Sequence, residues 1–170
     1  MPAHAPPRTI ARTMAHAAAV AGLLLGLASP ALANRDRHAG YYYPPVDSRE
    51  VYTARAITLA DANRDVRLGF IVGVTKKMLE RSYPPRFVIF AKGDEAEKMI
   101  IIGLGDGYLD TIYRARAVLA MLTSVVRTTR YLNELGVADF FTFFDLAKLL
   151  GFKQITISDG DHFSHQIIIE

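Results

Sequence analysis

The C-terminal end of the chain carries the pattern that most restricts its fold. Residues 154–157 and 163–169 alternate between apolar and polar side chains, which is the period of a half-buried β-strand. Asp159-Gly160 stands between them, and this dipeptide between alternating runs is a strong local signal of a β-hairpin. Because an isolated hairpin is marginally stable in water, the pattern requires a larger sheet with a second layer packed against it.

Other strands are expected earlier in the chain. Phe87–Ala91 and Met99–Ile102 are short runs of β-branched and aromatic residues on either side of a charged segment, which predicts a second antiparallel hairpin. Ala54–Leu59 and Val66–Val74 are also predicted to be strands. A helical turn is expected at Lys76–Arg81.

Two helices follow from apolar residues spaced three and four apart. The first begins after Asp106, its expected N-cap, and is apolar nearly all round at Ala117–Val126, which predicts a buried central helix. The second is expected at Phe140–Leu150 with Asp139 as its N-cap. The predicted fold class is therefore α+β, with a mainly antiparallel sheet covered by two helices and a C-terminal β-hairpin.

Residues 1–33 have the three parts of a secretory signal peptide. Arg8 and Arg12 precede a short apolar stretch, and small residues at Ala31-Leu32-Ala33 match a cleavage site before Asn34. The apolar core is too short to span a bilayer. We expect export to the periplasm or the medium, without stable insertion in a membrane after cleavage.

The expected mature protein is nearly neutral and lacks cysteine. Cleavage removes two of the 20 basic residues, which leaves 18 against 17 acidic ones, so nothing indicates a nucleic-acid partner. The absence of cysteine excludes disulfides, thiolate metal sites and cysteine nucleophiles. The predicted organisation is a signal peptide (1–33), an irregular arm rich in Tyr and Pro (34–50) and a single α+β domain (51–170).

Asp159, Asp161 and His162 form the cluster whose side chains suit a metal ion. Two carboxylates beside a glycine, completed by an imidazole, are ligands for a divalent cation. The competing interpretation is ordinary turn chemistry, because aspartate and glycine are typical of hairpin turns. His165 shares its strand face with Phe163 and Ile167, which favours a core or edge histidine.

No catalytic residue is predicted. The glycine-rich segment 103–107 lacks the spacing of a dinucleotide-binding or P-loop motif, and we expect a tight turn there. No Ser-His-Asp motif or Gly-x-Ser-x-Gly elbow is visible. Any cofactor stays unknown at this level.

Three segments, residues 91–98, 106–117 and 140–152, carry a resemblance to known proteins. Their sequences AKGDEAEK, DGYLDTIYRARA and FFTFFDLAKLLGF resemble a family of small exported bacterial proteins of uncharacterised function. Members of that family sometimes carry the label molybdopterin-guanine dinucleotide biosynthesis protein A. The resemblance supplies no catalytic residue that matches a position in this chain.

Two classes of function remain open from the sequence. The first is an exported, non-catalytic binding or assembly module that uses its Tyr-rich arm, its Phe-rich helix or a sheet edge to contact an envelope protein. The second is an enzyme, either metal-dependent through the terminal hairpin or a nucleotidyltransferase, as the label of the resembling family implies. We expect the first.

Overall fold

The computed structural model describes residues 42–128, 130–134 and 136–170. Every described residue belongs to one compact unit, which spans residues 37–170. The predicted signal peptide and its cleavage site between Ala33 and Asn34 therefore lie outside the described residues. Within the described residues, no helix has the length and apolar character needed to cross a membrane.

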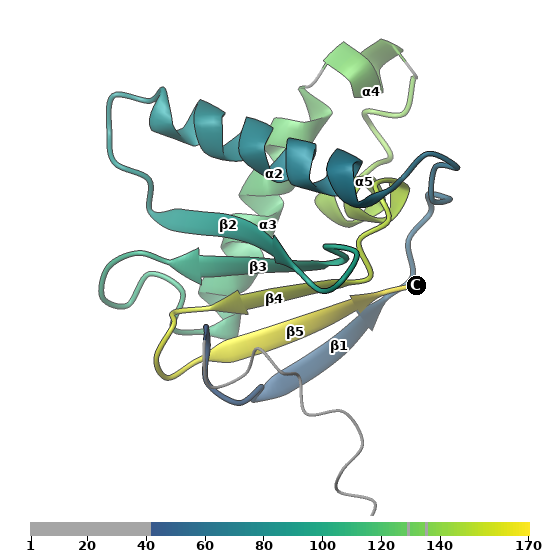
Figure 1. Cartoon of the computed structure of the whole chain (residues 1–170). Coiled ribbons are helices and arrows are strands. Elements are labelled where there is room, and N and C mark those ends of the chain that lie inside the picture. The colour runs from purple at the N-terminus through teal and green to yellow at the C-terminus, as the bar shows by residue number, and fades with distance from the viewer. Residues whose placement is uncertain (1–41, 129, 135) are drawn as a thin grey trace, which may run out of the picture. The chain divides into compact units, whose positions relative to one another are not determined.

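A five-stranded sheet in the order β1-β5-β4-β3-β2 is the frame of this unit (Figure 1). The strands are β1 (Ser48–Tyr52), β2 (Phe87–Lys92), β3 (Lys98–Gly103), β4 (Gln154–Ser158) and β5 (Ser164–Ile169). The β2–β3 and β4–β5 pairs are antiparallel, whereas β1–β5 and β3–β4 are parallel. The sheet is mixed, so the prediction of a mainly antiparallel sheet is wrong. Parallel partners are joined by long connections, which leave no local turn signal in the sequence.

Both predicted hairpins are confirmed. Ile89 lies opposite Ile101 in the first, and Ile155 lies opposite Ile167 in the second. The strand expected at Ala54–Leu59 is wrong, because that segment is irregular. The strand instead occupies β1, which begins inside the predicted arm. Its sequence SREVY has one aliphatic residue and no apolar alternation, because this strand lies at the edge of the sheet.

Helix α2 (Arg64–Leu79) replaces the strand predicted at Val66–Val74. Asn63 caps the helix, since its side-chain oxygen accepts a hydrogen bond from the backbone N–H of Val66 at 3.0 Å. The helical turn predicted at Lys76–Arg81 is present as the last turn of this same helix, which ends at Leu79 with Glu80 as its C-cap. Its apolar residues recur at the helical period and pack on the core, as Phe70, Ile71, Val74 and Met78 show.

Helix α3 (Ile112–Arg127) passes behind the sheet in the view of Figure 1. Its N-cap is Thr111, not Asp106. The expectation that this helix is buried on nearly every side is wrong, because one face is buried and the other faces solvent. The buried residues are Ala115, Val118, Leu119, Leu122 and Val126, and the exposed apolar ones include Tyr113, Met121 and Val125.

The Phe-rich helix is shorter than expected. Helix α5 (Phe143–Leu149) follows the short α4 (Arg130–Glu134) and begins at a capping box. Thr142 accepts from the backbone N–H of Asp145, and the Asp145 carboxylate accepts from the backbone N–H of Thr142 at 2.8 Å. This reciprocal pair starts the helix three residues after Phe140. Gly151 ends it with a φ of +81°, as a C-terminal glycine does.

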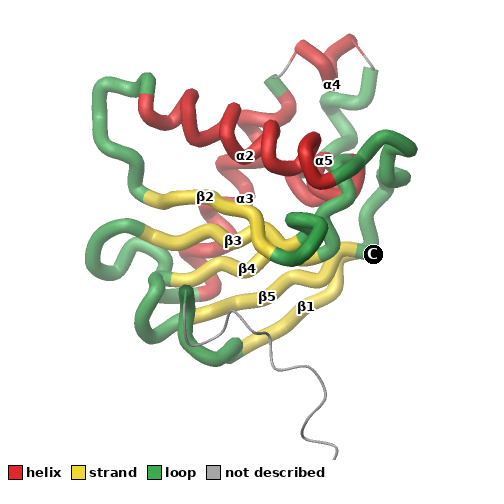
Figure 2. Tube along the Cα trace, viewed as in Figure 1, coloured by secondary structure: helices red, strands yellow, loops and turns green. Residues whose placement is uncertain are grey.

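One face of the sheet and the helices share a single apolar core, and Figure 2 shows how these helices and strands are arranged. Alternate strand residues contribute to it, as period-two alternation predicts. The sheet residues in the core are Phe87, Ile89, Met99, Ile101, Ile155, Ile157, Ile167 and Ile169, and the helices and loops add the others, among them Leu119 and Leu122 of α3 and Phe143 and Ala147 of α5.

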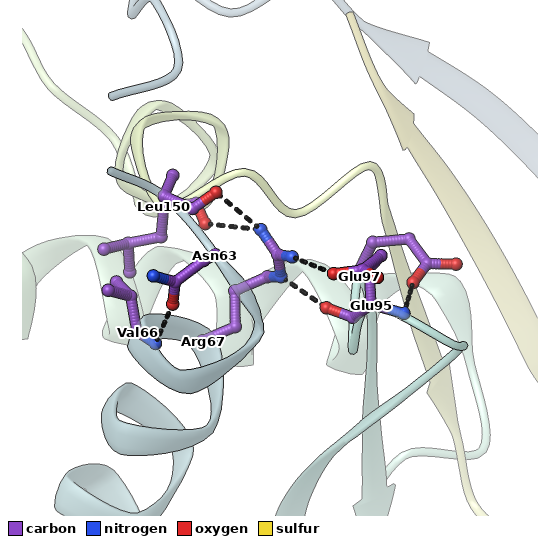
Figure 3. Close-up of polar contacts among 7 residues, drawn as sticks. Asn63, Val66, Arg67, Glu95, Glu97 and Leu150 are labelled. Carbon is purple, nitrogen blue, oxygen red and sulfur yellow. Dashed lines mark hydrogen bonds and ion pairs between the residues drawn. The ribbon is translucent and has the colours of Figure 1, made fainter. Parts of the chain in front are cut away.

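A buried arginine ties three segments of the fold together (Figure 3). Arg67 of α2 is 5% exposed. Its Nε donates to the backbone oxygen of Glu95 at 2.8 Å, and its Nη1 donates to the backbone oxygens of Ala62 and Leu150 at 3.4 and 3.3 Å. The guanidinium therefore joins α2 to the β2–β3 turn and to the end of α5.

Candidate functional site

One end of the sheet gathers the loops that carry the polar chemistry of this fold. The parallel strands β3 and β4 both end there, β5 and β1 begin there, and the loops that follow α2, β3 and β4 meet at that end, on the left of Figure 2. In sheets with parallel strands, ligands bind outside the carboxyl ends of those strands. A ligand site is therefore expected at this end of the sheet.

The glycine-rich loop after β3 forms the tight turn predicted from the sequence. Gly105 and Gly107 have φ angles of +95° and +69°, values that favour glycine. The backbone N–H of Leu104 donates to the backbone oxygen of Arg86 at 2.7 Å. This bond holds the loop against the segment that leads into β2.

Two adjoining hollows lie beside this loop and share Arg86, Leu104, Tyr108 and Met121. We call the pair the Arg86 groove. One hollow, of about 660 Å³, extends along α3 toward Arg114, Ala117 and Val118. The other, of about 650 Å³, extends toward Met78, Arg81 and the Tyr83-Pro84-Pro85 segment.

The groove combines aromatic rings with cations. The guanidinium of Arg86 lies 5.8 Å from the centre of the Tyr108 ring, and that of Arg81 lies 5.9 Å from the Tyr83 ring. Arg114 is neutralised by Asp110, with its Nη1 at 2.9 and 3.0 Å from the two carboxylate oxygens. Within the described part of the chain, neither Arg81 nor Arg86 forms an ion pair with a carboxylate. The groove therefore holds two cations that are not in an ion pair, and Asp106 is a carboxylate that also lines its α3 side.

The predicted metal-binding residues lie at the tip of the β4–β5 hairpin. Oδ1 of Asp159 accepts hydrogen bonds from the backbone N–H groups of Asp161, His162 and Phe163 at 2.9, 3.0 and 2.9 Å. Burial opposes the ionisation of Asp159, but these donors outweigh it, so the pKa of Asp159 lies below its ordinary value. The Asp159 carboxylate thus organises the turn.

Asp161 and His162 are neighbours in the sequence, and their side chains also contact each other. Oδ2 of Asp161 lies 2.9 Å from Nδ1 of His162, and both side chains are largely exposed. Together with Asp159 they border a hollow of about 550 Å³ opposite Asp106 and Asp110. Among the residues that the structure describes, no group of three or more histidine or carboxylate side chains is arranged to hold a metal ion.

A polar network that the sequence reasoning missed joins β1 to β5 and α3. Oγ of Ser48 lies 2.7 Å from Nδ1 of His165, and Nε2 of the same ring lies 3.2 Å from Oε1 of Glu50. Nη2 of Arg116 on α3 lies 3.2 Å from the other carboxylate oxygen of Glu50. His165 is 3% exposed, as expected for a core histidine.

Oε1 of Glu50 lies within ion-pair distance of Nε2 of His165, but the two groups are not aligned for a hydrogen bond. Nε2 of His165 is buried and has no aligned hydrogen-bond partner. Burial opposes the ionisation of Glu50, but His165 and Arg116 outweigh it and hold the pKa of Glu50 below its ordinary value. Ser48 and Glu50 stand two apart on a strand, which is the sequence signal for a shared face. That signal fell in a segment predicted to be irregular.

Comparison of the chain with models of protein families, with curated proteins and with solved structures gives no match.

Proposed function

We propose that the protein is an exported binding or assembly module and that its ligand site is the Arg86 groove. The groove would hold its ligand without catalysis. The observation that carries this proposal is the guanidinium of Arg86, which stacks near Tyr108 and has no carboxylate partner among the described residues. Such a cation, placed in a half-apolar hollow, is suited to an anionic group on a ligand.

The walls of the groove favour a ligand that also has an apolar part. Leu104 and Met121 are 44% and 38% exposed, and Tyr83 is 58% exposed. A solvent-exposed group of large apolar side chains around cations is typical of a binding surface. The exposure of Met121 on α3 is then explained, because this side chain lines both hollows of the groove. An envelope protein with an acidic and aromatic segment would fit, whereas the nearly neutral mature charge does not favour nucleic acid.

Binding of a fluorescent anilinonaphthalene sulfonate tests this proposal. The probe joins one sulfonate to aromatic rings, so it matches both features of the groove. We expect Arg86→Gln to weaken its binding by about tenfold or more, since a hydrogen bond to a charged group contributes about 1.5–3 kcal/mol. Arg64→Gln, on the exposed first turn of α2, is the matched control and should bind as the unaltered protein does. Equal affinities for all three proteins would refute the proposal.

A further inference from the structure

The Ser48–His165–Glu50 network has the order of groups found in enzymes with a serine nucleophile. A hydroxyl contacts one nitrogen of an imidazole, and a carboxylate contacts the other nitrogen. We propose that Ser48 is an activated nucleophile that accepts acyl groups from small uncharged carboxylic esters. This activity is separate from binding in the Arg86 groove and goes beyond it.

The placement of the carboxylate sets the proton positions that such chemistry needs. Oε1 of Glu50 lies 3.2 Å from Nε2 of His165 without the alignment of a hydrogen bond, so it is the negative charge of the carboxylate that favours the tautomer with its proton on Nε2. Nδ1 is then an acceptor, and the hydroxyl of Ser48 at 2.7 Å donates to it. Arg116 holds the second oxygen of the carboxylate and thereby fixes its orientation. The hydroxyl proton is thus directed to the base before a substrate arrives.

A purely structural role does not explain why a histidine and a carboxylate are placed together at this buried position. His165 lies on the face of β5 that also carries Ile167 and Ile169, and its partner on β4 is Ile157. Burying an imidazole and placing a carboxylate against it costs solvation free energy, which an apolar residue at position 165 would avoid. Ser48 is an exposed residue at the start of an edge strand, and the contact of its Oγ with His165 is only part-buried, so a substrate can approach it from solvent.

The charges at the same end of the sheet disfavour an anionic substrate, although Ser48 and His165 do not themselves line the hollow that carries them. Four aspartates, Asp106, Asp110, Asp159 and Asp161, border the hollow that Phe163 also lines, two residues before His165. These carboxylates repel an anionic acyl group. An uncharged ester meets no such barrier.

The acyl transfer proceeds in two balanced halves. Oγ of Ser48 bonds to the ester carbonyl carbon while its proton passes to Nδ1 of His165. The bond from that carbon to the alcohol oxygen then breaks, and the leaving oxygen takes the proton from His165. In the second half, water repeats the attack, its proton passes through His165 to Oγ, and the acyl group leaves as a carboxylic acid.

Covalent labelling of the purified protein tests the proposal. A fluorophosphonate reacts with an activated serine by forming an Oγ–P bond and releasing fluoride. We expect one adduct, mapped to Ser48 by mass spectrometry of peptides from the unaltered protein, and release of p-nitrophenol from p-nitrophenyl acetate. Ser48→Ala should abolish both, whereas Ser124→Ala, which removes an exposed hydroxyl on α3, should abolish neither.

The role of the carboxylate is tested by Glu50→Gln, which keeps the shape and removes the charge. We expect labelling of Ser48 to slow by about tenfold or more, with complete labelling at long times and with a thermal melting curve that shows a folded protein. A mere support for β1 would change the melting curve and leave the rate of labelling unaltered. No adduct on the unaltered protein, an adduct on another residue, no release of p-nitrophenol or an unchanged rate in Glu50→Gln would overturn the proposal.

Discussion

Replacement of Arg67 by methionine is expected to be the most informative test of how this fold is held together. The change keeps an unbranched side chain of similar length, so the packing of the arginine stem is largely preserved. It removes the guanidinium that donates to three backbone oxygens from separate segments (Figure 3). Those oxygens belong to Ala62, Glu95 and Leu150.

The magnitude follows from the individual contacts. The Nε bond to the Glu95 backbone oxygen, at 2.8 Å, is a charge-assisted bond that contributes about 1.5–3 kcal/mol. The two Nη1 contacts at 3.3 and 3.4 Å lie at the long end of the range and together add about 1 kcal/mol. The ion pair with the carboxylate of Glu95, at 3.8 Å and with that side chain 71% exposed, adds at most about 0.5 kcal/mol. The free energy of unfolding should fall by about 2.5–4.5 kcal/mol.

Denaturant and thermal unfolding measure this loss directly. For a domain of this size, the loss corresponds to a fall in melting temperature of roughly 10 °C or more. Glu95→Gln is the matched control, because it keeps the backbone oxygen and removes only the exposed carboxylate, and it should change stability by less than about 0.5 kcal/mol. If Arg67→Met costs no more than this control, the guanidinium does not hold the three segments together.

Four further outcomes are expected. Leu122→Ala should cost about 2–5 kcal/mol in denaturant unfolding, because Leu122 is 7% exposed on the buried face of α3; a loss below about 0.5 kcal/mol would place it at the surface. Folding lowers the pKa values of Glu50 and Asp159, so both carboxylates stabilise the protein above their ordinary pKa values of 4.5 and 3.8, and this stabilisation is lost as the pH falls through the lowered values. Asp159→Asn should therefore make the melting temperature depend less on pH in acid. An unaltered pH dependence would argue against the hydrogen bonds of Asp159. A chelator should leave the melting temperature unchanged, because the Asp159 carboxylate organises its own turn; a fall that added metal reverses would support the metal site instead. Intact mass of protein from the cell envelope should show Asn34 as the first residue, and a retained Met1 would refute cleavage.

The elements that the sequence predicted correctly are those with local signals. In the two hairpins, β-branched residues alternate on either side of short polar turns, and each strand pairs with its neighbour in the chain.

The elements that the sequence analysis missed are those in which helix and strand preferences compete, or in which the paired strands lie far apart in the sequence. Val66–Val74 contains enough β-branched and aromatic residues for a strand, but the cap at Asn63 and the packing of one helical face favour a helix instead. β1 pairs with β5 across more than a hundred residues, so no sequence window contains both. The same separation hid the contact of Ser48 with His165.

The Arg86 groove could be predicted only in part. Its aromatic and cationic residues come from the Tyr83-Pro84-Pro85 segment, the glycine-rich loop and α3. The loop and the helix were recognised, but the groove depends on the outward face of α3, which the sequence reasoning placed in the core. Alanine, valine and methionine on that face gave no polar stripe to mark it as exposed.

An NMR titration of the isotopically labelled protein with anilinonaphthalene sulfonate tests the central claim most directly, because it reports where the ligand binds. The proposed function predicts the largest shifts of backbone amide signals at residues 83–86 and 104–108, and at Met121 on the facing side of α3. The exposed apolar face of α2 offers Val72 and Leu79 beside a hollow that no arginine lines. Shifts concentrated at that face, with residues 83–86 and 104–108 unaffected, would contradict the assignment of the Arg86 groove as the ligand site.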